Sequence, residues 1–219
     1  MARMSRLVVP GYPHHVTQRG NRRLRTFFNM GDYRAYIDLI AEAKDKAGCD
    51  IWAYCLMPNH VHFVIVPAHE SSLALLFKEA HRRYTRRINA RQEWQGHLWQ
   101  ERFHSAVLDE PHLNAAVRYV ELNPVAAGLC DTPQRWRWSS VHAHLGANDD
   151  ELVSVKPMLA RFPAWLEYLG NNQSCEMLDS IRQQTKTGRP LGNDSFILAL
   201  EQQTGRMLRF HKSGRKPIE

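Results

Sequence analysis

The chain has 219 residues and a formal net charge of +7; 43% of its residues are hydrophobic and 23% are charged. This composition is typical of a folded globular protein and excludes a disordered or fibrous chain. No stretch approaches the ~18 apolar residues that a membrane-spanning helix needs, and the apolar run near the start is too short for a signal peptide. We therefore expect a cytoplasmic protein that is not exported.

The charge and the cysteines narrow the possible partners and compartments. The chain has 29 Lys and Arg residues and 22 Asp and Glu residues. This positive balance favours a polyanionic partner, with nucleic acid a better candidate than an anionic membrane. The four cysteines contain no Cys-x-x-Cys pair, which argues against a zinc knuckle and a disulfide scaffold and fits a reducing compartment.

The apolar pattern predicts four strands alternating with helices. In chain order these are a strand over 13–18, a helix over 31–47 ended by Gly48, strands over 51–57 and 60–66, a helix from Ser71 or Ser72 to about 91, a strand over 103–108, and a helix from about 112. Pro124 disfavours helical geometry in the residue before it, so we expect this last helix to end at Asn123. The order predicts an α+β fold, with helices packed on a mainly antiparallel sheet.

The character of the chain changes to helical after about residue 146. We expect a main domain over 1–146 and a small helical C-terminal region over 147–219 that binds DNA or braces the fold. Its predicted helices span 152–169, broken at Pro157 and Pro163, then 176–185, then 194–203 with Asn193 or Asp194 as the cap, before a basic tail.

Two histidines on the predicted strand over 60–66 form the first candidate site. His60 and His62 are two residues apart, so they project to the same side of the strand. Two neutral imidazoles placed in this way can bind a divalent cation. Strand histidines without a function would give the same pattern, so the pair alone does not decide.

Tyr119 and Asn123 form the second candidate group. They are four residues apart and therefore share one face of the predicted helix. The Asn oxygen could add a hard third ligand to the two imidazoles, and such a neutral, incomplete set suits Mg²⁺ or Mn²⁺ better than structural zinc. In the alternative interpretation, Tyr119 is a core aromatic residue and Asn123 only ends the helix before Pro124.

Several segments together resemble the single-tyrosine HUH transposases, and among these the transposases associated with repetitive extragenic palindromic (REP) sequences. They are HVTQRGNRR, YCLMPNHVHFVI, LWQERFHSAVLDE, RYVELNPVAAGL, RWRWSSVHAHLG and TGRPLGNDSFI, which follow the family order and span about residues 5 to 216. The resemblance implies the HUH nuclease fold, which is ferredoxin-like or RRM-like.

The resemblance also implies a metal-dependent endonuclease and strand transferase that acts on single-stranded DNA beside REP-type hairpins. It places the nucleophile, which would form a 5′-phosphotyrosine, on Tyr119, and Mg²⁺ or Mn²⁺ on His60, His62 and Asn123. Insertion-sequence relatives have Gln at the third ligand position, so Asn123 departs from their pattern. Those relatives are dimers, whereas the extra C-terminal region leads us to expect a monomer, associated with the nucleoid.

Basic residues predict where DNA phosphates bind, although an ordinary solvated helix face would explain those on the helix up to residue 91. The predicted contacts are Arg22, Arg23, Arg82, Arg83, Arg86, Arg87, Lys212 and Arg215. Tryptophans could stack on unpaired bases, but we expect most of them in the core. The general base is not assigned; His14, His15 and His104 are the candidates.

Three other functions remain compatible with parts of this pattern. A replication initiator or relaxase would use the same chemistry for another purpose. A catalytically silent protein that binds hairpin DNA would need the basic surfaces but not Tyr119. A metalloprotein unrelated to nucleic acid would explain His60 and His62 but would leave the arginine-rich surfaces unused.

Overall fold

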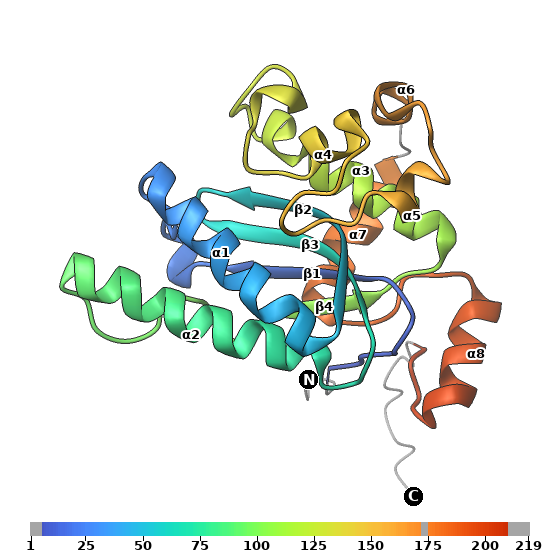
Figure 1. Cartoon of the computed structure of the whole chain (residues 1–219). Helices are drawn as coiled ribbons and strands as arrows, with labels where there is room; N and C mark the ends of the chain where they lie inside the picture. Colours follow the sequence, from blue (N-terminus) through green and yellow to red (C-terminus); the bar gives the residue numbers. More distant parts are fainter. Residues whose placement is uncertain (1–5, 172–174, 210–219) are drawn as a thin grey trace, which may run out of the picture.

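A computed structural model describes residues 6–171 and 175–209 of the chain (Figure 1). Within these ranges, four antiparallel strands form one sheet in the order β2-β3-β1-β4. The strands are β1 (His14–Arg19), β2 (Cys49–Met57), β3 (His60–Pro67) and β4 (His104–Val107). All four lie within two residues of their predicted bounds, and the predicted α+β class is confirmed.

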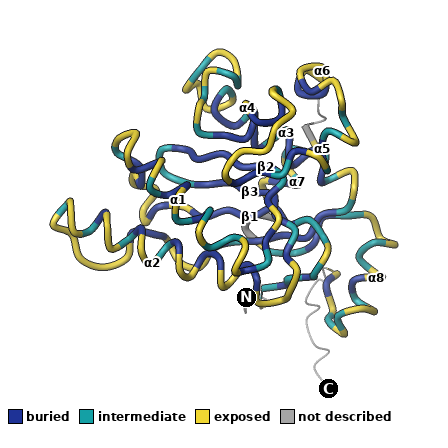
Figure 2. The backbone as a smooth tube through the Cα atoms, in the orientation of Figure 1, coloured by how far each residue is buried: buried dark blue, intermediate teal, exposed yellow. Residues whose placement is uncertain are grey.

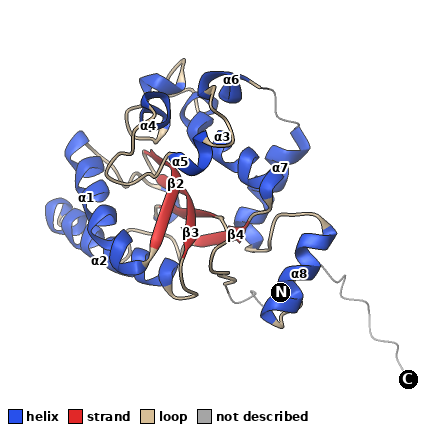
Figure 3. Cartoon of the chain, turned by 45° about the vertical axis from the view of Figure 1, so that its right-hand side comes forward, coloured by secondary structure: helices blue, strands red, loops and turns tan. Residues whose placement is uncertain are grey.

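Helices cover both faces of this sheet (Figures 1 and 3). Helices α1 (Met30–Ala47) and α2 (Ser72–Gln92) pack on one face, and α3 (Glu110–Ala126) packs on the other. The remaining helical segments are η1 (Asn21–Arg23), η2 (Pro133–Arg135), α4 (Val141–Gly146), α5 (Lys156–Leu159), α6 (Trp165–Gly170), α7 (Cys175–Thr187) and α8 (Asp194–Thr204). In the described ranges, no helix combines the length and the apolar character that crossing a bilayer requires.

The alternation of side chains along β3 divides the core into two layers. Val61, Phe63 and Ile65 are fully buried under α1 and α2, whereas Val64 is buried on the side of α3. Figure 2 shows this burial concentrated in the sheet, with the outer surface of α2 exposed. His60 and His62 share the α3 side with Val64, so the strand period fixes which layer holds the candidate site.

The helix ends follow local side-chain chemistry at most positions. Asn29 and Asp32 form a capping box at the start of α1, and Gly48 ends it in the left-handed conformation with φ 62°. Asn193 caps α8 by accepting a hydrogen bond from the Phe196 N–H. Ser71 occupies the N-cap position of α2 without a side-chain cap bond, so the predicted serine cap is absent.

The predicted end of α3 at Asn123 is wrong, because the helix continues through Pro124 to Ala126. A proline near the end of a helix removes only one of its hydrogen bonds, and here its ring is buried. The predicted start near residue 112 is two residues late, because Asp109 caps the helix by accepting from the His112 N–H. The extra turn places Asn123 inside the helix, where its backbone geometry is fixed.

The predicted helical stretch over 152–169, broken at Pro157 and Pro163, is confirmed only in part: a break does fall at Pro163, but Pro157 lies in the first turn of α5 and residues 152–155 are not helical. Only the short helices α5 and α6 form there, and the chain before them runs as a loop. The Asp150 carboxylate accepts hydrogen bonds from the backbone N–H groups of Leu152 and Val153, and these bonds compete with helix formation. Val153 instead pairs with Ile51 at the edge of the sheet.

The C-terminal region packs on the sheet at two places. Val153 lies beside β2, and Leu191 pairs with Leu108 just beyond β4. Helix α8 buries Leu200 in a small cluster with Leu7 and Val107. The boundary near residue 146 stays a prediction, but the segments on its two sides share one core.

Candidate functional site

The register of the central strands brings the predicted residues to one place. His62 lies opposite Thr17, and His60 lies opposite Arg19, because β1 and β3 pair antiparallel. Helix α3 crosses the same face of the sheet and carries Tyr119. Residues more than fifty positions apart in the sequence therefore meet above β1 and β3.

The distances within this group are short. The ring centroids of His60 and His62 are 4.8 Å apart, and those of His62 and Tyr119 are 5.5 Å apart. The amide nitrogen of Asn123 lies 3.5 Å from Nε2 of His62. All four residues that the sequence assigned to nucleophile and metal thus lie in one cluster.

Two neighbours hold the histidine rings through their Nδ1 atoms. Nδ1 of His62 is 3.0 Å from Nε2 of His15, and Nδ1 of His60 is 2.6 Å from Oδ1 of Asn59. The rings of His15 and His62 are nearly parallel, with an interplanar angle of 4°. From the sequence, His15 was only a candidate base, and Asn59 was not among the candidate site residues.

Burial keeps these imidazoles neutral. It lowers the pKa of His60 to about 3, helped by the charge of Arg19, and lowers the pKa of His15 to about 4. The pKa of His62 falls well below its usual 6.5, because the ring is buried and lies near His60, His15 and Arg19. At neutral pH each ring therefore carries one proton, the state in which imidazole binds metals.

The donor set fits a divalent cation with several open positions. The Asn123 amide nitrogen lies 3.5 Å from Nε2 of His62, so the amide and the imidazole could hold one cation between them. A half-turn of that amide exchanges its nitrogen for its oxygen. In the described ranges, no three His, Cys, Asp or Glu side chains gather as a metal site, and the Asn123 amide is a polar group within reach of His62.

An open pocket of about 470 Å³ surrounds Tyr119 and the two histidines. Its lining residues come from five segments of the chain: Thr17, Gln18, Arg19, Arg23, His60, His62, Gln100, Glu101, His104, Tyr119 and Arg182. Three arginines against one glutamate make the pocket positive, as binding a phosphate requires. Burial and the charge of Arg23 lower the pKa of Arg19, and interaction with Tyr119 raises it, so the guanidinium lies close to the tyrosine.

The predicted DNA-binding residues do not all lie at this pocket. Arg23 lines it, and Arg22 is exposed on the same loop with a left-handed φ of 54°. The arginines of α2 lie on the other face of the sheet, where Arg82 pairs with Glu79 and Arg83 with Glu42. This group also includes Arg86 and Arg87, which are exposed. Lys212 and Arg215 lie outside the described residues.

The histidines considered as bases separate into three environments. His14 faces away from the pocket, with its ring nitrogens near the Tyr12 carbonyl and the Val9 N–H. His15 is buried behind His62, and His104 lines the pocket. Of the tryptophans, Trp99 and Trp165 are buried in the core, as expected.

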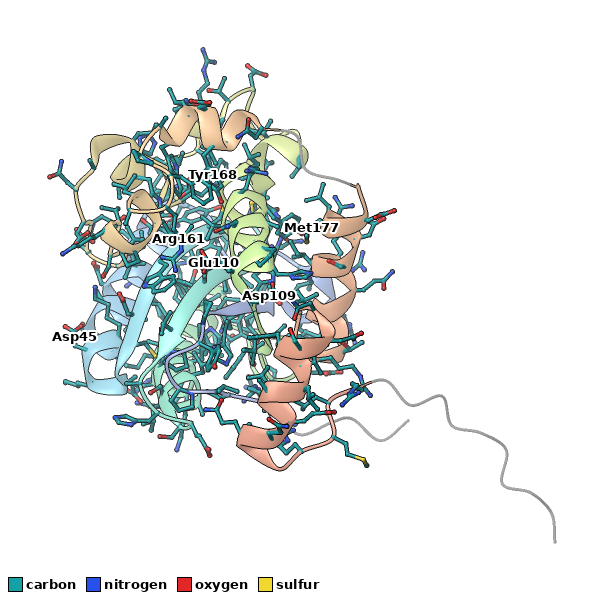
Figure 4. The ribbon with its side chains drawn as sticks, turned by 90° about the vertical axis from the view of Figure 1, so that its right-hand side faces the viewer. Asp45, Asp109, Glu110, Arg161, Tyr168 and Met177 are labelled. Atoms are coloured by element: carbon teal, nitrogen blue, oxygen red, sulfur yellow. The ribbon has the colours of Figure 1, made fainter. Side chains whose placement is uncertain are left out.

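Residues that the sequence did not single out also reach the pocket. Gln100 and Glu101 lie on the segment before β4, which hydrogen-bonds to Arg19 through the Gln100 N–H. Arg182 comes from α7, which packs beside α3 with Met177 between the two helices (Figure 4). The motif containing Gln100 was a signal for the first two, but no pattern pointed to Arg182.

A buried carboxylate anchors the helix that carries Tyr119. Glu121 is fully buried and accepts hydrogen bonds from Ser140, His144 and Trp165, with lengths of 2.6, 2.7 and 2.8 Å. The start of α3 is held on the surface by Glu110, which pairs with Arg161 (Figure 4). These contacts fix α3 along its length against the segments that follow it.

Comparisons with known proteins identify a family and a similar fold. Residues 9–123 match the family model described as "Transposase IS200 like", which is more than half of the chain. One solved structure, of a REP-associated tyrosine transposase bound to a REP hairpin, is 20% identical, with a TM-score of 0.58 over 70% of this chain and 92% of that one.

A second structure, of a putative transposase from Deinococcus radiodurans R1, is 18% identical, with a TM-score of 0.40 over 54% of this chain and 95% of that one. No curated protein matches the chain.

Proposed function

The chain belongs to the IS200-like transposase family, and on that premise we propose that it cuts and rejoins single-stranded DNA beside palindromic hairpins by transesterification. One observation carries the proposal: Tyr119, His60 and His62 line a single open, positively charged pocket, and the Asn123 amide lies 3.5 Å from Nε2 of His62. A tyrosine beside paired neutral imidazoles provides a nucleophile and a cation site, and the arginines provide a place for the phosphate.

The arginines of the pocket bind and orient the scissile phosphate. Arg19 and Arg23 approach from the β1 side and Arg182 approaches from α7, so the phosphate is held between two parts of the chain. Guanidinium groups suit this role because their planar donors match phosphate oxygens. The pocket is open, which lets a single strand enter and leave.

Tyr119 acts as the nucleophile. Its phenolic oxygen attacks the phosphorus, the bond to the 3′ oxygen breaks, and the products are a 5′-phosphotyrosine and a free 3′-hydroxyl. The phenolic proton passes to a base and the leaving oxygen gains a proton. Attack by another 3′-hydroxyl reverses the step, so strands are joined without ATP.

Mg²⁺ or Mn²⁺ bound by His60, His62 and Asn123 would supply charge neutralisation at the phosphoryl oxygens. His60 and His62 contribute neutral ring nitrogens, which burial preserves at neutral pH. Glu101 and His104 line the same pocket and are the groups best placed to move the proton of Tyr119.

The hairpin substrate is inferred from the fold. The solved structure that matches 70% of this chain is described as bound to a REP hairpin. We propose the same class of partner here, with the chain acting as a monomer. A replication initiator or relaxase would need the same pocket, and a silent hairpin-binding protein would not need Tyr119.

A covalent-adduct assay tests the proposal. The full chain is incubated with a hairpin oligonucleotide that has single-stranded flanks and with Mn²⁺, and adducts are resolved on a denaturing gel. We expect an adduct with the wild type and with Tyr12→Phe, the matched tyrosine outside the pocket, but none with Tyr119→Phe. His60→Ala and His62→Ala should lose cleavage and keep hairpin binding, since phosphate contacts supply most of the affinity. Normal cleavage by Tyr119→Phe would contradict the nucleophile assignment.

A further inference from the structure

We propose that His15 and Asn59 are positioning residues that fix the protons of His62 and His60 on Nδ1, so that both Nε2 atoms face the cation. The inference rests on the proposed function, because it takes His60 and His62 as metal ligands. It assigns a role to two polar side chains that touch the ligands and not the substrate.

His15 contacts His62 at the atom opposite its metal-binding nitrogen. Nε2 of His15 is 3.0 Å from Nδ1 of His62, and the two nearly parallel rings lie edge to edge with centroids 5.3 Å apart. On the other side of the same ring, Nε2 of His62 faces Asn123. The His62 ring is thus held between the neighbour that sets its proton and the proposed third ligand.

Only one of two proton arrangements allows metal binding. If Nε2 of His15 carries the proton and donates it, the proton of neutral His62 sits on its own Nε2 and blocks the cation. If Nδ1 of His62 donates to Nε2 of His15, the lone pair of His62 Nε2 is free. A bound cation therefore requires His15 to act as the acceptor.

Apart from His62, the aromatic neighbour of His15 is Tyr119, whose ring lies edge-on at 6.0 Å between centroids. The His15 side chain is 2% exposed, and in the part of the chain that the structure describes its Nδ1 has no hydrogen-bond partner. An apolar residue would fill this position without leaving a polar atom unsatisfied. Retaining an imidazole here is explained if its Nε2 is needed by His62.

Asn59 plays the corresponding part for His60. Its Oδ1 accepts from Nδ1 of His60 at 2.6 Å, and its Nδ2 donates to the carbonyl of Arg23 at 3.0 Å. The donation to Arg23 fixes which end of the amide faces His60, so Nδ1 of His60 must carry the proton. The same amide links the metal site to the arginine loop that lines the pocket.

Mn²⁺ binding to the full chain without DNA tests the inference separately from catalysis. Dissociation constants are measured by calorimetry for His15→Phe, which keeps a ring without an acceptor, and for His15→Gln, which restores one. Loss of such a supporting contact weakens metal binding by about 10–100-fold. We expect that loss for His15→Phe and Asn59→Ala, and a loss of less than about threefold for His15→Gln and Asn59→Asp. His14→Gln, on the same strand but facing away, is the matched control and should bind as the wild type does.

The outcomes distinguish this inference from the proposed function. If His60→Ala binds Mn²⁺ as tightly as the wild type, the metal site itself is wrong. If His60→Ala loses binding but His15→Phe and Asn59→Ala do not, the positioning role alone is refuted. Equal losses for His15→Phe and His15→Gln would also refute it.

Nitrogen NMR of the wild-type histidines with Mg²⁺ requires no variant and no change in fold. It should place the protons of His60 and His62 on Nδ1, and a proton on Nε2 of either would overturn the inference.

Discussion

Removing the carboxylate of Glu121 should destabilise the protein far more than removing Glu110 from the same helix. Glu121 is fully buried and accepts three hydrogen bonds of 2.6–2.8 Å, from Ser140, His144 and Trp165. Glu121→Ala leaves the buried donors of His144 and Trp165 without an acceptor, since only Ser140 has a second one in the Tyr54 carbonyl, and it opens a cavity. Breaking a buried charged network of this kind costs about 3–5 kcal/mol, which for a chain of this length lowers Tm by roughly 6–20 °C.

Glu110 supplies the matched control. It pairs with Arg161 at 2.6 Å, but both side chains are partly exposed. Exposed ion pairs contribute about 0–1 kcal/mol, so Glu110→Ala should lower Tm by less than about 4 °C. Glu121→Gln keeps an oxygen acceptor and should fall between the two.

Urea unfolding followed by far-UV circular dichroism at pH 7 gives the free energy of unfolding of each variant. Equal losses for Glu121→Ala and Glu110→Ala would refute the reasoning, because they would mean that the buried network contributes no more than a surface pair. The expected ranking also bears on the site, since Glu121 lies between Tyr119 and Asn123 on α3.

Three further predictions concern pH, DNA binding and the arginine loop. Burial lowers the pKa of four histidines to about 3 or 4 in the folded protein, against 6.5 in the unfolded chain. Their contribution to stability is therefore complete above pH 6.5 and is lost as the pH falls toward 4. The loss is about 1.4 kcal/mol per group and pH unit. The four histidines are His14, His15, His60 and His81. Urea midpoints measured from pH 8 to 5 should therefore fall below pH 6.5, and a flat profile would contradict this. Arg23→Ala should reduce the slope of log K against log salt concentration, where K is the binding constant for single-stranded DNA, by about 0.7 per lost phosphate contact. An unchanged slope would show that Arg23 does not contact DNA. The same measurement on Arg86→Ala decides whether α2 contacts DNA. In Gly20→Ala the new Cβ would lie 2.3 Å from the Leu24 carbonyl oxygen. We therefore expect the free energy of unfolding to fall by about 1–3 kcal/mol and DNA binding to weaken. An unchanged Tm would contradict this, because it would mean that the loop adapts to the added methyl group.

The strands and the site face could be read from the sequence because their signals are local. Alternation along 60–66 places His60 and His62 on one side, and the spacing of Tyr119 and Asn123 places them on one helix face. The sequence could not show that these two faces meet, since that depends on the packing of α3 against the sheet. The resemblance to a family supplied that step.

The failures have physical causes that a local pattern does not contain. Helix α3 continues through Pro124, whose ring is buried near the end of the helix. The residues from Leu152 to Val155 are not helical, because Asp150 binds the backbone of Leu152 and Val153. The predicted DNA contacts of the α2 arginines stay a prediction, since these residues lie across the sheet from Tyr119. Arg182 was missed because only packing of α7 beside α3 brings it to the pocket.

Peptide mapping of the DNA adduct tests the central claim most directly. Trypsin cleavage after Arg118 and Arg135 releases residues 119–135, in which Tyr119 is the only tyrosine, and a missed cleavage at Arg118 adds residues 103–118, which contain none. After digestion of the wild-type adduct with trypsin and nuclease, mass spectrometry should find a nucleotide 5′-phosphate on Tyr119. The same mass on a peptide with another tyrosine, or on a residue far from His60 and His62, would contradict the account.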